Sequence, residues 1–473
     1  MWIRCGIRSC SIMSRFSELR FPKTLHPGYT GLAIFLITGL VYALVSGPRV
    51  LSASKNNHFA YLARSHLAGT TRLVDPRPHG NDWARVQTLT LADGRVLSGT
   101  YWKTHGPNTF RTLSGDFVVV DPGTIRTRSE RWYVTFPPMP AWMMTPGVIL
   151  WGLHFNDVLF TLVLSALNAM LLWFLLLLAR QKGLHGRSDG ELAALVTLFA
   201  FGTVNFFSSV RGEVWYTAHV AGMNWTILYL MAVLRRKPAW AGFFLGAAFL
   251  CRTPMLFAGL IYPAYVWHRD GGLPGIRRAW REALLHALPL LGLVALAMAL
   301  NFSRFGNPFD FGHQYLEISW RRRMEQYGLF SAEYLSRNLS AMLTLLPRFS
   351  LSHPFVKISP HGMALWLTTP VFLLLLRASW KDAFARRILL LGVLPVAGLA
   401  LLYQNSGFVQ FGYRFSLDFT VFLMLLLAMS SIRFGRWFTA LLAFSIAVNL
   451  FGAITFGRMH AFYPGGSFFF FVS

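Results

Sequence analysis

The stretch YTGLAIFLITGLVYALVSG, residues 29–47, decides the fold class of this 473-residue chain. Its length is close to the about 20 apolar residues that an α-helix needs to cross the hydrocarbon core of a membrane. Basic residues precede it, as in a signal peptide, but the run is long and no A-x-A-like cleavage site follows it. The stretch therefore predicts an uncleaved signal-anchor helix behind a basic inner tail.

Ten further apolar runs along the chain are candidates for additional spans. They lie at 156–179, 191–209, 219–234, 239–252, 254–267, 286–302, 362–376, 388–403, 415–431 and 437–456. The two short runs 239–252 and 254–267 are also compatible with one hairpin around Arg252, Thr253 and Pro254. The pattern predicts an all-α polytopic membrane protein with about 11 transmembrane helices.

The distribution of charge orients these helices. A net charge of +25 with only 13% charged residues could by itself suggest nucleic-acid binding. The Lys and Arg residues instead form short clusters between apolar runs, as at 180–187, 235–237 and 377–387, whereas the alternate short loops carry almost none. By the positive-inside rule we expect a cytoplasmic N-terminus, an outer C-terminus and no nucleic-acid partner.

The expected topology divides the chain into seven parts. They are the basic tail 1–28, the first helix 29–47, a first outer loop 48–155, a helix bundle 156–302, a second outer loop 303–361, C-terminal helices 362–456 and an outer tail 457–473. Arg321, Arg322 and Arg323 in the second loop, with aromatic neighbours, suit either a surface helix at lipid headgroups or a solvated charged face.

The first outer loop begins with a predicted short helix. In KNNHFAYLARSHLAG, residues 55–69, Asn56 or Asn57 can cap the helix because a side-chain oxygen there accepts a free backbone N–H. Gly69 can end the helix in the left-handed conformation.

The same loop also predicts a small β-rich insert. VQTLTLADGRVLSGTYW, residues 86–102, has the alternation of a hairpin with Asp93-Gly94 at its turn, and DFVVVDPG, residues 116–123, predicts a further strand. The Pro-rich stretch YVTFPPMPAWMMTPGVILWGL, residues 133–153, then predicts a helix lying in the membrane interface.

Cysteine and histidine offer no metal or disulfide framework. Cys5 and Cys10 lie in the basic tail and Cys251 in an apolar run, so none falls in an expected outer loop. No Cys/His cluster has zinc-ligand spacing, and no phosphate-binding glycine loop, dinucleotide fingerprint or nucleophile motif is present. We expect no metal site and no certain cofactor.

Ionisable groups near the expected outer helix ends mark the candidate site, because such groups are costly within a bilayer. For Glu213 the simplest expectation is an ion pair with Arg211. Arg414 and Asp418 are four residues apart and can pair on a helix. Alternatively, the forked guanidinium of Arg414 can face a phosphate group.

Three parts of the chain resemble the GT-C superfamily of membrane glycosyltransferases. They are NHFAYLARSHLAG at 57–69, YVTFPPMPAWMMTPGVILWG at 133–152, and NFSRFGNPFDFGHQY at 301–315 together with FGYRFSLDF at 411–419. The resemblance implies transfer of a hexose or pentose from a polyprenyl-phosphate sugar to a glycan, lipid or protein acceptor. It places the reaction on the outer face of a bacterial inner (plasma) membrane. It also implies an acidic base in the first outer loop and cations at the donor phosphate.

The sequence departs from this family at one position. Asn57 stands where the resemblance implies an aspartate, and an amide cannot take a proton. The base is then His58, Asp75 or Asp82, or the protein has kept the fold and has a different function. We prefer Asp82, because HGNDW at 79–83 predicts a tight turn that points its side chain back at the membrane. A solvated ion pair with a nearby arginine is the simpler expectation for either aspartate.

The predicted site therefore has two groups of residues. The expected catalytic residues are Asp82, Asp75 and His58; the expected substrate-binding residues are Asn57, Tyr61, Glu213, His219, Arg304, His313, Tyr413 and Arg414. The alternatives are a non-catalytic GT-C-like scaffold or assembly partner in envelope glycan synthesis and, with less support, a transporter, which would show two matching halves with broken helices.

Overall fold

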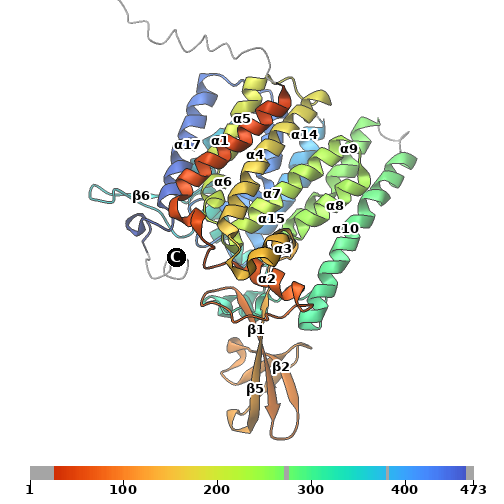
Figure 1. The fold of residues 1–473 in the computed structure, drawn as a ribbon, viewed down its shortest axis with the longest axis vertical. Coiled ribbons are helices and arrows are strands. Elements are labelled where there is room, and N and C mark those ends of the chain that lie inside the picture. The colour runs from red at the N-terminus through yellow and green to blue at the C-terminus, as the bar shows by residue number, and fades with distance from the viewer. Residues whose placement is uncertain (1–25, 271–275, 380–382, 465–473) are drawn as a thin grey trace, which may run out of the picture.

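A computed structural model describes residues 26–270, 276–379 and 383–464. Cys5, Cys10 and nearly all of the expected basic tail lie outside these residues. The described chain is a helix bundle with a β sheet projecting from one end, which we call the sheet end (Figure 1). α10 stands at one edge of the bundle and α17 at the opposite edge.

Most of the described chain is helical, because its long apolar runs can satisfy their backbone hydrogen bonds without water only within helices. The bundle consists of α1 (Pro27–Ser46), α4 (Asp157–Gln181), α5 (Asp189–Phe201), α6 (Asn205–Ser209), α7 (Glu213–Leu234), α8 (Pro238–Phe249), α9 (Ile261–Arg269), α10 (Ile276–Phe305), α14 (Ala383–Ile388), α15 (Leu394–Leu402), α16 (Leu417–Met429) and α17 (Arg436–Thr455). Two 3₁₀ segments, η6 (Thr253–Leu260) and η10 (Pro370–Arg377), interrupt it, and the π segment η11 (Leu389–Val393) joins α14 to α15.

Among the described residues, 6 helices are long and apolar enough to cross a membrane. They are Pro27–Leu51, Asp157–Gln181, Glu213–Leu234, Trp280–Phe305, Ala383–Leu402 and Arg436–Thr455. The chain therefore has the make-up of a membrane protein, as expected, with 6 of the expected 11 spans present as long helices.

The other five expected spans are shorter or interrupted. α5, α8 and α16 have 13, 12 and 13 residues and rise only about 20 Å, whereas a hydrocarbon core is about 30 Å thick. The expected span 191–209 is divided at Gly202, which lies between α5 and α6. The run at 254–267 passes from η6 into α9, and η6 packs back against α8 after the bend at Arg252, as a hairpin requires.

Polar side chains join α4 to α7 inside the apolar bundle. Thr161 and Thr217 share a hydrogen bond of 2.6 Å, and the amide of Asn168 donates to the carbonyl of Val220 at 2.8 Å. Asn224 in turn donates to the Asn168 side-chain oxygen at 2.9 Å. All four polar side chains are buried, so these hydrogen bonds replace water that the bundle excludes.

The β insert is a five-stranded antiparallel sheet with the order β4-β3-β2-β1-β5. The strands are β1 (Trp83–Leu91), β2 (Val96–Tyr101), β3 (Thr109–Thr112), β4 (Phe117–Val119) and β5 (Ile125–Val134). β1 and β2 form the predicted hairpin, with Asp93 and Gly94 in the turn between them. Gly99 has no room for a side chain, because a Cβ there would lie 2.0 Å from the carbonyl oxygen of Arg111.

Two short helices connect the sheet to the bundle. α2 (His58–Leu67) is the predicted helix, and Gly69 follows it with φ of +71°. The expected side-chain cap is wrong, because the Asn57 amide donates to the carbonyl of Leu153 at 3.2 Å. α3 (Met139–Trp151), with 13 residues, is too short to span a membrane, and it packs against α2.

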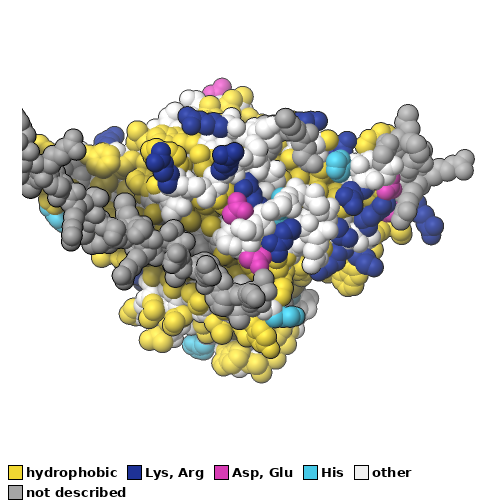
Figure 2. Space-filling model, turned by 90° about the horizontal axis from the view of Figure 1, so that it is seen from above, with side chains coloured by type: hydrophobic (Ala, Val, Ile, Leu, Met, Phe, Trp, Pro, Cys, Tyr) yellow, Lys and Arg dark blue, Asp and Glu magenta, His cyan; other side chains and the backbone are white. Residues whose placement is uncertain are grey.

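The second long loop contains short elements only. They are η8 (His313–Tyr315), α11 (Arg321–Tyr327), η9 (Ala332–Tyr334), α12 (Leu335–Leu343), the strands β6 (Arg348–Phe349) and β7 (Val356–Lys357), and α13 (Leu365–Thr368), which follows the loop. A further 3₁₀ turn, η12 (Arg414–Ser416), precedes α16. The opposite end of the bundle, viewed in Figure 2, shows Lys and Arg side chains among hydrophobic and uncharged ones.

Candidate functional site: a polar cavity at the sheet end of the bundle

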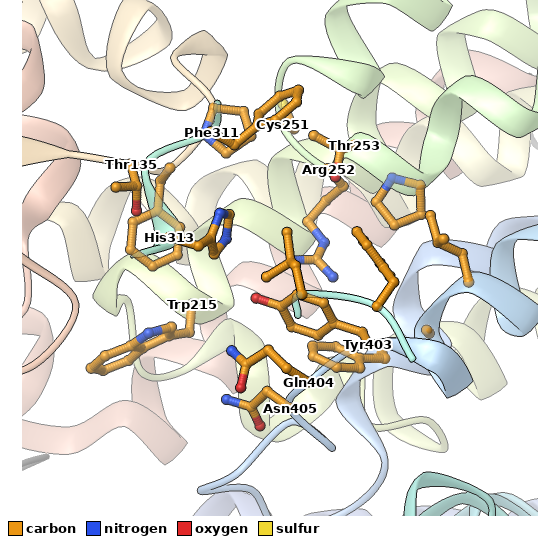
Figure 3. Close-up of a pocket in the computed structure, with 18 of the residues that line it drawn as sticks. Thr135, Trp215, Cys251, Arg252, Thr253, Phe311, His313, Tyr403, Gln404 and Asn405 are labelled. Carbon is orange, nitrogen blue, oxygen red and sulfur yellow. The ribbon is translucent and has the colours of Figure 1, made fainter. Parts of the chain in front are cut away.

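A cavity of about 360 Å³ lies where the first loop, the second loop and the late helices meet. Thr135 follows β5, Arg252 precedes η6, His313 begins η8, and Tyr403 and Gln404 follow α15. Figure 3 shows these side chains converging from well-separated parts of the chain. The fold thus brings together four segments that no local sequence pattern connects.

The cavity is lined by both polar and apolar side chains. Five of the apolar ones are called the apolar side below: Phe249, Leu256, Phe257, Phe330 and Leu399. Phe257 and Phe330 are 49% and 45% exposed, so the apolar side reaches the surface of the bundle. The cavity therefore suits a ligand with a polar head and an apolar tail.

Asp82 supplies the only carboxylate among the described residues that line this cavity. The chain bends at His79 and Asn81, within the stretch predicted to turn, and Asp82 has φ of +67°, a conformation that Asp and Asn tolerate better than most residues. The Trp215 indole donates to its carboxylate at 2.6 Å. Burial raises the pKa of Asp82 above the ordinary aspartate value, while this hydrogen bond and the nearby charge of Arg414 oppose the shift.

Arg414 faces the same cavity from η12 and is only 5% exposed. The side-chain oxygen of Gln410 fixes its backbone by accepting from the Arg414 N–H at 2.8 Å. The expected ion pair with Asp418 is wrong: within the described residues, Arg414 forms no ion pair, and its Nε has no hydrogen-bond partner. Asp82 is the opposite charge nearest in effect, but it forms no ion pair with Arg414, so the guanidinium is available to an anionic ligand.

Asp418 is instead the partner of Arg252. Arg252 donates to its carboxylate at 2.8 Å and His219 Nδ1 lies 2.8 Å from the other oxygen. Both Asp418 and His219 are buried, and His219 does not line the cavity. Asp418 therefore holds Arg252, and Arg252 rather than the predicted His219 faces the cavity.

His313 also lines the cavity, as predicted. Its Nδ1 has no hydrogen-bond partner among the described residues. Burial, together with the charge of Arg304, lowers the pKa of His313 to about 4, so the ring is neutral near pH 7. A neutral imidazole can accept one hydrogen bond and donate another to a bound ligand.

Four residues predicted from α2 and its surroundings do not line the cavity. His58 is buried, stacks on Trp83 at 3.9 Å between ring centroids, and binds the carbonyl of Asn81 through Nε2 at 3.1 Å. Burial lowers the pKa of His58 to about 4, which makes it a poor base but a firm support for the turn that holds Asp82. Asn57 binds the chain at Leu153, as described above.

Tyr61 and Asp75 also lie away from the cavity. The ring of Tyr61 meets Trp83 edge-on at 5.5 Å. Asp75 lies 3.8 Å from Arg64, and half of the Arg64 side chain is exposed. Asp75 therefore forms a loose ion pair with an arginine, which was the simpler expectation for this aspartate. Of the three predicted acid–base residues, only Asp82 therefore lines the cavity.

The remaining predicted binding residues do not line the cavity. Glu213 forms an ion pair of 3.0 Å with Arg211, which was the simplest expectation for Glu213, and both side chains are buried. Arg304 donates to the carbonyl of Val134 at 2.8 Å and to Asn301 at 2.7 Å, so its guanidinium is not directed at the cavity. Tyr413 is buried, and its hydroxyl has no partner among the described residues.

Several cavity residues were not predicted from the sequence. Trp215, Arg252, Trp320, Tyr403 and Gln404 are among them. Arg252 had a signal, since it is a charge within an apolar run, and Gln404 is a polar residue at a helix end. Nothing in the local sequence marks the two tryptophans or Tyr403.

Within the described ranges, no three His, Cys, Asp or Glu side chains are grouped so as to hold a metal ion. Fold and cavity together define a mostly helical, membrane-type protein with a polar and aromatic cavity at one end. Comparisons with protein-family models, with curated proteins and with solved structures find no match to the chain. Its function therefore has to be inferred from its own residues.

Proposed function

We propose that the protein is a membrane glycosyltransferase that moves a sugar from a polyprenyl-phosphate donor to an envelope acceptor. The observation that supports this proposal best is that a carboxylate, a cation and apolar side chains line the same cavity. Asp82 offers a carboxylate, Arg414 offers a cation that forms no ion pair among the described residues, and the partly exposed Phe257 and Phe330 belong to the apolar lining.

The chemistry assigns one role to each of these groups. The acceptor hydroxyl oxygen bonds to the anomeric carbon of the sugar while its proton passes to the Asp82 carboxylate. The bond from the anomeric carbon to the phosphate oxygen breaks, and its electron pair leaves with the lipid phosphate. Arg414 stabilises the charge that develops on that phosphate. Burial favours proton uptake by Asp82, because it disfavours the charged carboxylate.

The apolar side of the cavity suits the lipid part of the donor. A polyprenyl chain lying against Phe257 and Phe330 stays in contact with the membrane while its phosphate reaches the polar side. Arg252 is already neutralised by Asp418, so Arg414 is the stronger attraction for the phosphate.

The proposal also includes an orientation. Lys and Arg side chains are exposed at the bundle end opposite the sheet (Figure 2), and by the positive-inside rule this end would face the cytoplasm. The sheet end and the cavity are then on the outer face, where the acceptor would be an envelope glycan, lipid or protein.

The test is envelope glycan mass spectrometry on a deletion strain that carries the native gene, Asp82→Asn or Asp75→Asn. Asn tolerates the φ of +67° and its side-chain oxygen still accepts from Trp215, so Asp82→Asn removes little besides the charge. Asp75→Asn is the matched control in the same loop, outside the cavity.

At equal protein level, we expect the native gene and Asp75→Asn to restore a sugar that the deletion lacks. Loss of a general base costs about 10²–10⁴ in rate, so Asp82→Asn should not restore it. Full restoration by Asp82→Asn would show that Asp82 is not the base. An unchanged glycan profile in the deletion strain would overturn the proposed transfer.

A further inference from the structure

A second group of cations lies beside the cavity. Arg323 in α11 and Arg337 in α12 both donate to the carbonyl of Gln404, at 3.5 Å and 2.7 Å. Gln404 also lines the cavity, so the two arginines bind the backbone of a residue that belongs to the proposed reaction site. The guanidinium groups are therefore held together at the edge of the cavity by the backbone.

The two guanidinium groups share an aromatic platform. Their carbon atoms lie 5.7 Å and 5.5 Å from the centre of the Tyr334 ring. Tyr334 is 2% exposed, and its hydroxyl donates to the carbonyl of Gly328 at 2.7 Å. Because this ring is fixed, it limits the freedom of both arginines and prepares them for a ligand.

This pair of cations has no carboxylate partner within 4.0 Å among the residues that the structure describes. Glu325, the nearest acid along α11, is paired with Arg321 at 3.0 Å. Glu333 stands four residues before Arg337 but forms no ion pair with it. The pair therefore carries an uncompensated charge of about +2, because both guanidinium groups stay protonated at pH 7.

Unused donors accompany this charge. A guanidinium has five N–H donors, and the described hydrogen bonds of Arg323 use only Nη2. Arg337 uses Nη2 for Gln404 and Nε for Asn338 at 3.3 Å, so Nη1 is left. Burial, together with the charge of Arg323, lowers the pKa of Arg337 to about 10, which is the effect expected of two cations held close together.

A purely structural role explains this arrangement less well. One carbonyl oxygen needs a single neutral donor, whereas two adjacent cations repel each other and the partly buried Arg337 also loses solvation. A phosphate group removes this cost, because its oxygens match the forked donors of guanidinium groups.

We propose that Arg323 and Arg337, seated on Tyr334, form a second anion site that binds a phosphate group at the edge of the cavity. The phosphate belongs either to a soluble phosphorylated molecule or to the headgroup of an anionic phospholipid. This site is separate from Arg414, and its occupancy does not depend on sugar transfer.

The test uses the purified full-length chain in discs of zwitterionic phosphatidylcholine. Thermal unfolding is followed with inorganic phosphate and with chloride at equal ionic strength, for the native protein, Arg323→Gln, Arg337→Gln and Arg322→Gln. Arg322 is the matched control, because it is exposed as Arg323 is and belongs to the same run of arginines, but has no described contact with Gln404 or the Tyr334 ring. Ligand bound only by the folded protein raises the unfolding temperature.

A second arm uses discs that contain one tenth phosphatidylglycerol, with the retained lipid counted by native mass spectrometry. We expect the native protein and Arg322→Gln to respond to phosphate, to retain phosphatidylglycerol, or both. Arg323→Gln and Arg337→Gln should reduce that response to the part, if any, that Arg414 supplies. A phosphate shift identifies a soluble source, and lipid retention alone identifies a headgroup.

The inference is overturned if the native protein shows neither response, or if all variants respond alike. If a glutamine variant does not fold, Arg337→Lys serves instead, because it keeps the charge and should weaken phosphate binding without abolishing it. Asp82→Asn should keep the full phosphate response, so failure of the sugar-transfer proposal would leave this result standing.

Discussion

Replacing Glu213 with glutamine should destabilise the protein more than any change at an exposed ion pair. The Glu213 carboxylate accepts from Arg211 Nε and Nη2 at 3.1 Å and 3.0 Å, and the two side chains are only 7% and 3% exposed. Glu213→Gln preserves the shape but leaves the Arg211 charge buried without a counter-charge. Breaking a buried pair in this way costs about 3–5 kcal/mol.

The assay is a denaturant titration of the purified protein in detergent micelles, followed by tryptophan fluorescence. The control is Asp93→Asn, which removes an ion pair that is shorter, at 2.6 Å, but is 63% and 49% exposed. This control should show no measurable change, because water screens exposed charges.

A double variant, Arg211→Met with Glu213→Gln, completes the experiment. It removes both charges, so it should lose less stability than the sum of the two single variants. The reasoning is refuted if Glu213→Gln unfolds at the native midpoint, or if the two single changes simply add.

Three further predictions concern the sheet and the two titratable groups near the cavity. Gly99→Ala should lower the unfolding temperature and the yield of folded protein, because its Cβ would collide with the carbonyl of Arg111; an unchanged melting curve would contradict this. Transfer activity should fall as the pH drops through a pKa of Asp82 that lies above the ordinary aspartate value, since the base must be ionised; a pH profile without this limb would argue against the role. The neutral ring of His58 contributes stability that is complete above about pH 6.5 and is lost as the pH falls toward about 4, so His58→Phe should unfold with less acid dependence in this window.

The long helices could be predicted from the sequence because their apolar runs are long enough to exclude other structures. The interrupted ones could not, since an apolar run predicts burial without fixing the backbone conformation. The run at 191–209 illustrates this: Thr203 donates to the carbonyl of Phe199 at 2.8 Å, and the chain leaves the helix at Gly202. The β hairpin was predictable, because Asp93-Gly94 favours a tight turn between alternating strands.

The site was predictable only where a residue is constrained locally. The bend before β1 is encoded in the local stretch HGNDW, and it brings Asp82 into the lining of the cavity. Asp418 shows the opposite case: its sequence neighbour Arg414 satisfied the spacing rule, yet its partner Arg252 is 166 residues away. Which arginine is neutralised depends on how distant segments pack, and the spacing along one helix does not contain that information.

The hydrogen bonds that join α4 to α7 restrict how the protein can move. A slide of one helix along the other by one turn, about 5.4 Å, would separate Thr161 from Thr217 and strip Asn168 of both of its partners. α4 and α7 are therefore held in a fixed register relative to each other. Relative movement within the bundle is easier along segments such as η6, where the helical ladder is already interrupted.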